Sequence, residues 1–286
     1  MNSIKKSKDV PLNLAVDNYK SLIFEGSPYS NSNKILEKSL PKITQKDVKA
    51  YYDKAFYSQN VVISINGNVD KDKAIADFTK IFNGKNGEKF DYGKYSVTQL
   101  ATKKQACATV KDLKTDWIIY GWQTDGILNR KEYATLQVID SLLGSGMSSR
   151  LFKNLRDRDG LAYQLGSQFS PHIVKGSFIT YIGTNPENLD YAKKRMLEEV
   201  FRLKTEFVGS KELQEAKDKL LGHYIIGQET NLDKATTIGW FETSGRGYKF
   251  DDQYAQLINS VTESDIIEVA NKIFTGNYVL SIVKPQ

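Results

Sequence analysis

Two segments of the 286-residue chain repeat one another, and this repeat limits the folds that the chain can adopt. Residues 43–65 read ITQKDVKAYYDKAFYSQNVVISI, and residues 261–282 read VTESDIIEVANKIFTGNYVLSI. Each copy opens with Thr-x-x-Asp, a pattern that caps a helix, and each reaches a phenylalanine at the same spacing before it enters an apolar strand. The sequence therefore predicts two copies of one helix–strand unit.

A weaker part of the repeat lies upstream of each copy. Residues 11–29 and 231–248 both read as apolar-periodic helices that run into a glycine-containing turn and end at a tyrosine. The second copy follows a long organised segment, whereas the first follows almost none. We therefore expect residues 1–84 to be the C-terminal half of a first repeat and residues 108–286 to be a complete second repeat. Residues 85–107 are rich in Gly and Lys without a sustained period, and are predicted to connect the two.

The second repeat mixes strands and helices without a strict strand–helix–strand alternation. This order favours the α+β class, with an antiparallel or mixed sheet and helices packed on one face, over a doubly wound parallel sheet. The predicted elements are a strand near 117–122, helices at 130–143 and 148–159, strands at 161–169 and 176–183, helices at 186–205, from 210 onward and at 232–244, and then the repeated helix and strand.

The segment SSRLFKNLRDRDGLAY, which begins at Ser148, predicts a helix followed directly by a strand. Ser148 or Ser149 can cap the helix, and Gly160 supplies its C-terminal stop. The residues after Gly160 alternate between apolar and small or polar types, which is typical of a strand with one buried face. Arg156 is therefore expected in the last helical turn and Tyr163 near the start of the strand.

Composition excludes several classes of protein. The formal charge is +6, but the basic residues are mostly lysine and are interleaved with 34 acids, which favours a solvated surface over a nucleic-acid site. A lysine-rich nucleic-acid binder is therefore a distant third hypothesis. No run approaches the roughly 18 apolar residues of a membrane span, and the opening MNSIKKSKD lacks the core of a signal peptide. The cytoplasm is the default location, and a missing N-terminal signal would leave periplasmic or secreted locations open.

Several short sequence motifs, in their order and spacing, resemble those of the M16 family of zinc metallopeptidases, which includes pitrilysin, insulin-degrading enzyme and the mitochondrial processing peptidase. In the second repeat these motifs are LLGSGMSSRLFKNLRDRDGLAY, GSFITYIGTNPEN and SKELQEAKDKLLG, and in the first they are FEGSPYSNSN and NVVISINGNVD. The resemblance covers essentially the whole chain. It implies two similar α+β repeats that face each other across a chamber.

The resemblance also implies zinc, held in the first repeat by a helix that carries His-x-x-Glu-His. Two histidines at that spacing share one helix face, and the glutamate acts as general base. This chain has only His172 and His223, and neither has the required partners, so each is interpreted as a core or surface residue. Alignment of IKKSKDVP with the family pattern places Ser3 at the position of a further zinc-binding glutamate. We therefore predict no metal site and no cofactor in this chain.

The residues that carry over from the family are Arg156 and Tyr163. In the family, the matching arginine and tyrosine face the zinc across the chamber and hydrogen-bond the substrate near the scissile carbonyl. A guanidinium and a phenol are suitable donors to an oxyanion. The alternative, from the residues alone, is that Arg156 pairs with helix carbonyls or with Asp157 and that Tyr163 belongs to the core.

Two functions follow from the resemblance. In the first, the chain is part of a zinc endopeptidase that cleaves peptides or unfolded polypeptides, supplies the substrate-binding half and is inactive alone. An extended substrate would then add as a strand to a sheet edge. In the second, the chain is a non-catalytic partner or scaffold in a heteromeric peptidase. Both readings predict a zinc-bearing M16 half or subunit as the partner.

Overall fold

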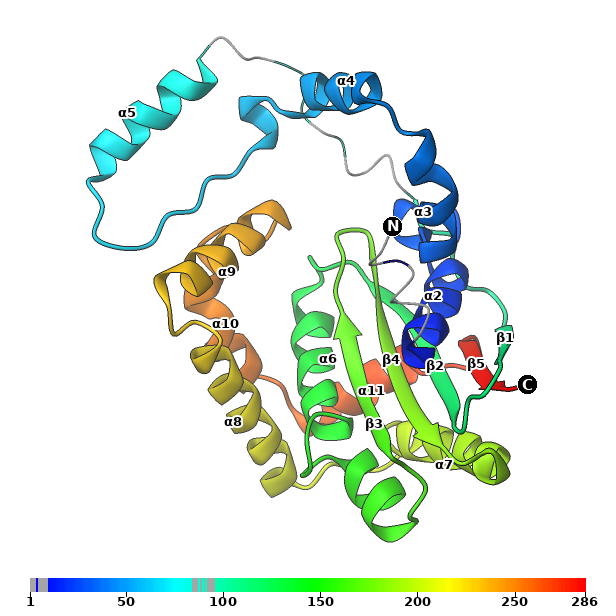
Figure 1. Cartoon of the computed structure of the whole chain (residues 1–286). Helices are drawn as coiled ribbons and strands as arrows, with labels where there is room; N and C mark the ends of the chain where they lie inside the picture. The colour runs from blue at the N-terminus through cyan, green and yellow to red at the C-terminus, as the bar shows by residue number, and fades with distance from the viewer. Residues whose placement is uncertain (1–3, 5–9, 84–86, 88, 90, 92–95) are drawn as a thin grey trace.

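A computed structural model describes residues 4, 10–83, 87, 89, 91 and 96–286 of the chain. Its centre is a five-stranded sheet with the order β1-β5-β2-β4-β3 (Figure 1). β1 runs parallel to β5, and the other neighbours are antiparallel, so the predicted α+β fold with a mixed sheet is confirmed. The strands are β1 (Lys104–Val110), β2 (Asp116–Asp125), β3 (Gln164–Ser170), β4 (Lys175–Thr184) and β5 (Val279–Pro285).

One face of this sheet carries the helices of the second repeat. Side chains of β2, β4 and β5, among them Trp122 and Phe178, form one buried cluster with side chains of these helices. Burial of large apolar side chains is the main force that holds the layers together. The helices are α6 (Arg130–Leu143), the π-helix η5 (Phe152–Arg158), α7 (Leu189–Arg202), α8 (Ser210–Ile226), α9 (Asn231–Thr243), α10 (Phe250–Asn259) and α11 (Glu263–Ile273), with a short 3₁₀ turn η6 (Pro186–Asn188) before α7.

The opposite face of the sheet is covered by α2 (Pro11–Ile23), which comes from the first-repeat part of the chain. Ala15 and Tyr19 of α2 are buried against a second apolar cluster that includes Ile119 and Val283. Gly121 of β2 permits this contact, because a Cβ atom built on it would lie 2.0 Å from the Cε2 atom of Tyr19. The helix formed by residues 11–23 therefore packs on the sheet formed by residues 104–285.

The rest of the first-repeat part extends away from the sheet (Figure 1). Its helices from α3 onward have no buried residue. The predicted caps are confirmed, because Thr44 with Asp47 and Thr262 with Asp265 form matching capping boxes. The elements are η1 (Pro28–Ser30), α3 (Asn33–Ser39), η2 (Leu40–Lys42), α4 (Gln45–Ala55), η3 (Ser58–Asn60) and α5 (Lys71–Phe82).

Two predicted strands and the predicted connector differ from the structure. The strand expected at the end of the first copy is not formed: residues 61–65 pair with no strand in the described part of the chain, because no equivalent of β2 is present there. β3 begins at Gln164 rather than at residue 161, since the turn at Gly160 continues through the next residues. β1 begins at Lys104, inside the segment predicted as a connector, because its pairing with β5 orders it.

Replacement of Gly121 by alanine tests the packing of α2 on the sheet. We expect Gly121→Ala to lower the free energy of unfolding by about 1–3 kcal/mol, because the new methyl group overlaps the buried Tyr19 ring. Gly222→Ala is the control, since a Cβ atom at that position of α8 meets no atom within 4 Å. Chemical denaturation of both variants measures the difference, and an unchanged stability of Gly121→Ala would contradict the packing.

Candidate functional site

The corner that carries Arg156 is a π-helix rather than the α-helix predicted. Its wider turn is closed by bonds from the Asp159 amide to the Asn154 carbonyl, at 3.1 Å, and from the Leu161 amide to the Leu155 carbonyl, at 2.8 Å. Gly160 then adopts a φ of 63°, a left-handed conformation that favours glycine. Short π-helical segments are rare and occur frequently at functional sites.

Arg156 lies exposed on this π-helix, and its guanidinium carbon is 4.8 Å from the centre of the Phe152 ring. Within the described residues it forms no ion pair with Asp157 or another acid, so that part of the alternative interpretation is wrong. An aromatic ring holds a guanidinium through its π face and leaves the N–H edges available. Arg156 is therefore placed as a donor toward the exterior.

Tyr163 is also exposed, with 61% of its surface accessible, so the interpretation of this residue as core is wrong. It lies directly before β3, and its amide donates to the Gly183 carbonyl at 3.0 Å, which fixes its backbone to β4. The phenol donates to the Asn185 Oδ1 atom at 2.7 Å. Arg156 and Tyr163 thus occupy the two ends of one corner, with no direct bond between them among the described residues.

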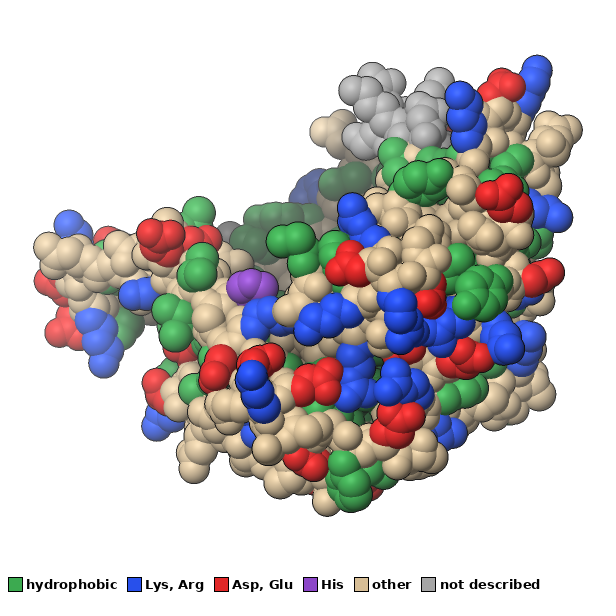
Figure 2. Space-filling model, turned by 90° about the horizontal axis from the view of Figure 1, so that it is seen from below, with side chains coloured by type: hydrophobic (Ala, Val, Ile, Leu, Met, Phe, Trp, Pro, Cys, Tyr) green, Lys and Arg blue, Asp and Glu red, His purple; other side chains and the backbone are tan. Residues whose placement is uncertain are grey.

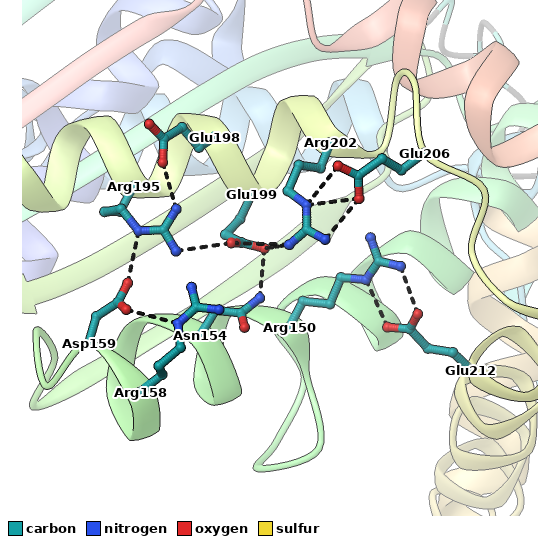
Figure 3. Close-up of polar contacts among 10 residues, drawn as sticks. All are labelled: Arg150, Asn154, Arg158, Asp159, Arg195, Glu198, Glu199, Arg202, Glu206 and Glu212. Carbon is teal, nitrogen blue, oxygen red and sulfur yellow. Dashed lines mark hydrogen bonds and ion pairs between the residues drawn. The ribbon is translucent and has the colours of Figure 1, made fainter.

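A buried carboxylate on α7 fixes the position of the π-helix (Figure 3). Glu199 is 1% exposed and accepts hydrogen bonds from the Asn154 amide at 2.8 Å, from Arg195 at 3.2 Å and from Arg202 at 3.1 Å. Arg195 also bonds the Asp159 carboxylate at 2.8 Å. We call these contacts among Asn154, Asp159, Arg195, Glu199 and Arg202 the Glu199 network. Asn154 and Asp159 flank Arg156 in sequence, so the network holds the backbone on both sides of Arg156.

Two opposing effects set the pKa of Asp159 in the Glu199 network. Burial raises the pKa of Asp159, but the hydrogen bonds from Arg195 and Arg158 outweigh this effect and hold the pKa below its ordinary value. Asp159 is therefore ionised at neutral pH. At the start of the same segment, Arg150 binds Glu212 of α8 through two bonds of 2.8 and 2.7 Å. Paired bonds of this kind fix orientation as well as distance.

Two glutamates next to each other on α7 allow a matched test of the Glu199 network. Glu199→Ala removes a buried carboxylate that pairs with two arginines, and we expect it to lower the free energy of unfolding by about 3 kcal/mol. Glu198 also pairs with Arg195 but is 41% exposed, so Glu198→Ala should cost less than about 1 kcal/mol. Urea denaturation compares the variants, and equal losses would show that the network does not anchor the corner.

Neither histidine is placed as a metal ligand. His172 stacks on Tyr29, with ring centres 4.3 Å apart, and meets Phe24 edge-on at 5.2 Å. Burial, with a smaller effect of Lys20, lowers the pKa of His172. His223 lies on α8. The part of the chain that the structure describes contains no group of three or more His, Cys, Asp or Glu that fits zinc, and Ser3 lies outside it.

Charged side chains of both signs lie on one face of the molecule. Figure 2 shows Lys and Arg side chains interspersed with Asp and Glu on the lower face of the molecule. Many of these charges form ion pairs, such as that between Arg202 and Glu206. Such a face lacks the continuous positive potential that attracts a phosphate backbone. None of the described helices is both long enough and apolar enough to cross a membrane.

Comparison with known proteins places the chain in a peptidase family. The sequence profile described as "Peptidase M16 inactive domain" matches residues 42–220, so the chain belongs to the M16 peptidase family. An uncharacterized zinc protease of Rickettsia felis is 28% identical over 100% of this chain, which spans 68% of that relative. The uncharacterized zinc protease YmxG of Bacillus subtilis is 26% identical to this chain; the matched region covers 87% of this chain and 60% of YmxG.

Solved structures show the same fold. A protease from Helicobacter pylori matches with a TM-score of 0.85 and 20% identity, over 97% of this chain and 68% of that chain. The peptidase M16 inactive domain from Pseudomonas fluorescens also matches with a TM-score of 0.85, at 22% identity, over 100% of this chain and 68% of that chain. The profile match confirms the resemblance to the M16 family that the sequence motifs indicated.

Proposed function

We propose that this chain supplies the substrate-binding half of an M16 zinc peptidase, without the zinc, and that Arg156 and Tyr163 contact the substrate. The observation that carries the proposal is the corner itself. Two exposed donors lie at either end of a π-helix-to-strand turn, and a buried ion network fixes that turn.

The chemistry of the two side chains suits the carbonyl of a peptide. During hydrolysis the carbonyl oxygen gains negative charge, and donors already fixed in place stabilise it without reorganisation. The Arg156 guanidinium offers several N–H groups, and the Tyr163 phenol offers one O–H, which Asn185 accepts in the free chain. Activation of water is assigned to a separate zinc-bearing half, and the substrate class is a peptide or unfolded polypeptide.

Three findings support the proposal that this chain binds the substrate and that a separate zinc-bearing half activates water. The matched profile is that of the inactive M16 domain, the relatives are named zinc proteases, and the described residues contain no metal cluster. The chain is therefore predicted not to hydrolyse peptides by itself. The alternative, a non-catalytic scaffold, shares the partner but assigns no role to Arg156 and Tyr163.

Activity in the presence of a zinc-bearing M16 half tests the two roles. We expect Arg156→Ala and Tyr163→Phe each to lower kcat about a hundredfold, because each removes one donor to the oxyanion. Lys153→Ala is the control, since Lys153 is an exposed cation on the same π-helix and is not part of the Glu199 network; the activity of this variant should stay near that of the wild type. Unchanged kcat in the first two variants would favour the scaffold.

A further inference from the structure

Asn185, which accepts the hydrogen bond of the Tyr163 phenol, has a fixed backbone. It follows Thr184, the fully buried last residue of β4. It precedes Pro186, and a proline restricts the residue before it to extended conformations; Asn185 accordingly has a φ of −66° and a ψ of 144°. Its carbonyl accepts from the Asn188 amide at 2.9 Å. The strand on one side and the η6 turn on the other therefore hold Asn185 in place.

The Asn185 side chain is directed to Tyr163 rather than to its own turn. An asparagine before a helical turn often caps that turn by accepting from a backbone amide. Asn185 forms no such bond to the amides of η6, all of which lie in the described part of the chain. Its Oδ1 atom instead accepts from the Tyr163 hydroxyl at 2.7 Å. Because the Tyr163 backbone is bonded to Gly183, both ends of this contact are held and the O–H has a defined direction.

The single proton of the phenol limits what Tyr163 can do for a substrate. A phenol has one O–H to donate, and in the free chain Asn185 accepts it. A substrate carbonyl is an amide oxygen like that of Asn185, so transfer of the bond from Asn185 to a bound peptide gains little. An oxyanion is charged, and hydrogen bonds to ionised acceptors are about twice as strong. The exchange becomes favourable only when charge develops on the carbonyl oxygen.

We propose that Asn185 is a positioning residue that holds the Tyr163 O–H in the ground state and releases it to the oxyanion. Asn185 acts through Tyr163 and itself touches no reacting atom. The inference rests on the proposed function, in which Tyr163 donates to that oxyanion. An interaction that forms only in the transition state raises kcat without tightening the binding of the substrate. Asn185 thus makes the contribution of Tyr163 selective for the transition state.

Nuclear magnetic resonance of the isolated chain tests the contact without any peptidase activity. Tyrosine is labelled with ¹³C at its Cζ atom, and the Tyr163 signal is identified by its loss in Tyr163→Phe. We expect Asn185→Asp to move this signal downfield, because a carboxylate is a stronger acceptor than an amide. Asn188→Ala is the control, since Asn188 lies in the same turn and its side chain caps no amide of α7 among the described residues. An unmoved Tyr163 signal in Asn185→Asp overturns the inference.

Cleavage of a quenched fluorescent peptide, with a zinc-bearing M16 half present, measures the role of Asn185 in the reaction. We expect Asn185→Asp to lower kcat at least tenfold at a nearly unchanged KM, because the carboxylate keeps the O–H from the oxyanion. Asn185→Ala should lower KM about fivefold, the effect of one neutral hydrogen bond, because the freed phenol donates to the substrate before it reacts. This change in KM should disappear when Asn185→Ala is combined with Tyr163→Phe.

Failure of the inference and failure of the proposed function give different results. If Tyr163→Phe lowers kcat but Asn185→Ala changes KM equally with and without the phenol, the inference is overturned and the proposed function stands. If Tyr163→Phe keeps the kcat of the wild type, the proposed function fails for Tyr163 and the inference falls with it. The downfield signal, the separate effects on kcat and KM, and their dependence on the phenol together support the inference.

Discussion

The packing of α2 on the sheet of the second repeat joins the two parts of this chain, and the remaining arrangement depends on it. Tyr19 enters a space that exists only because β2 has glycine at position 121, and the Ser281 hydroxyl ties β5 to the helix backbone. A matching contact brings α9 of the second repeat against Ser64 of the first. α2 thus covers the face of the five-stranded sheet that lies opposite the helices formed by residues 130–273.

The second constraint is the buried charge of Glu199. A carboxylate with 1% exposure is stable only when its partners are fixed, and here Asn154, Arg195 and Arg202 surround it. These contacts couple α7 to the π-helix and leave Arg156 and Tyr163 on the outside of a rigid turn.

The sequence predicted most of the fold because the repeat and the caps are local signals. The capping boxes at Thr44 and Thr262 could be read from spacing, and the α+β class from the order of the predicted elements. The π-helix could not, because it depends on bonds such as Leu161 to Leu155 that have no sequence signature. The Glu199 network joins residues far apart in the chain. Residues 61–65 have the pattern of a strand, but pattern alone does not supply the neighbouring strand that pairing requires.

The central claim is that α2 is held on the sheet by its contacts with β2 and β5, whereas residues 61–65 pair with no strand among the described residues. Amide hydrogen exchange measures this most directly, because pairing protects backbone amides and the two sequence copies provide an internal comparison. In the isolated chain, the amides of residues 279–283 should exchange slowly and those of residues 61–65 quickly. Equal protection of both copies in the isolated chain would contradict the account.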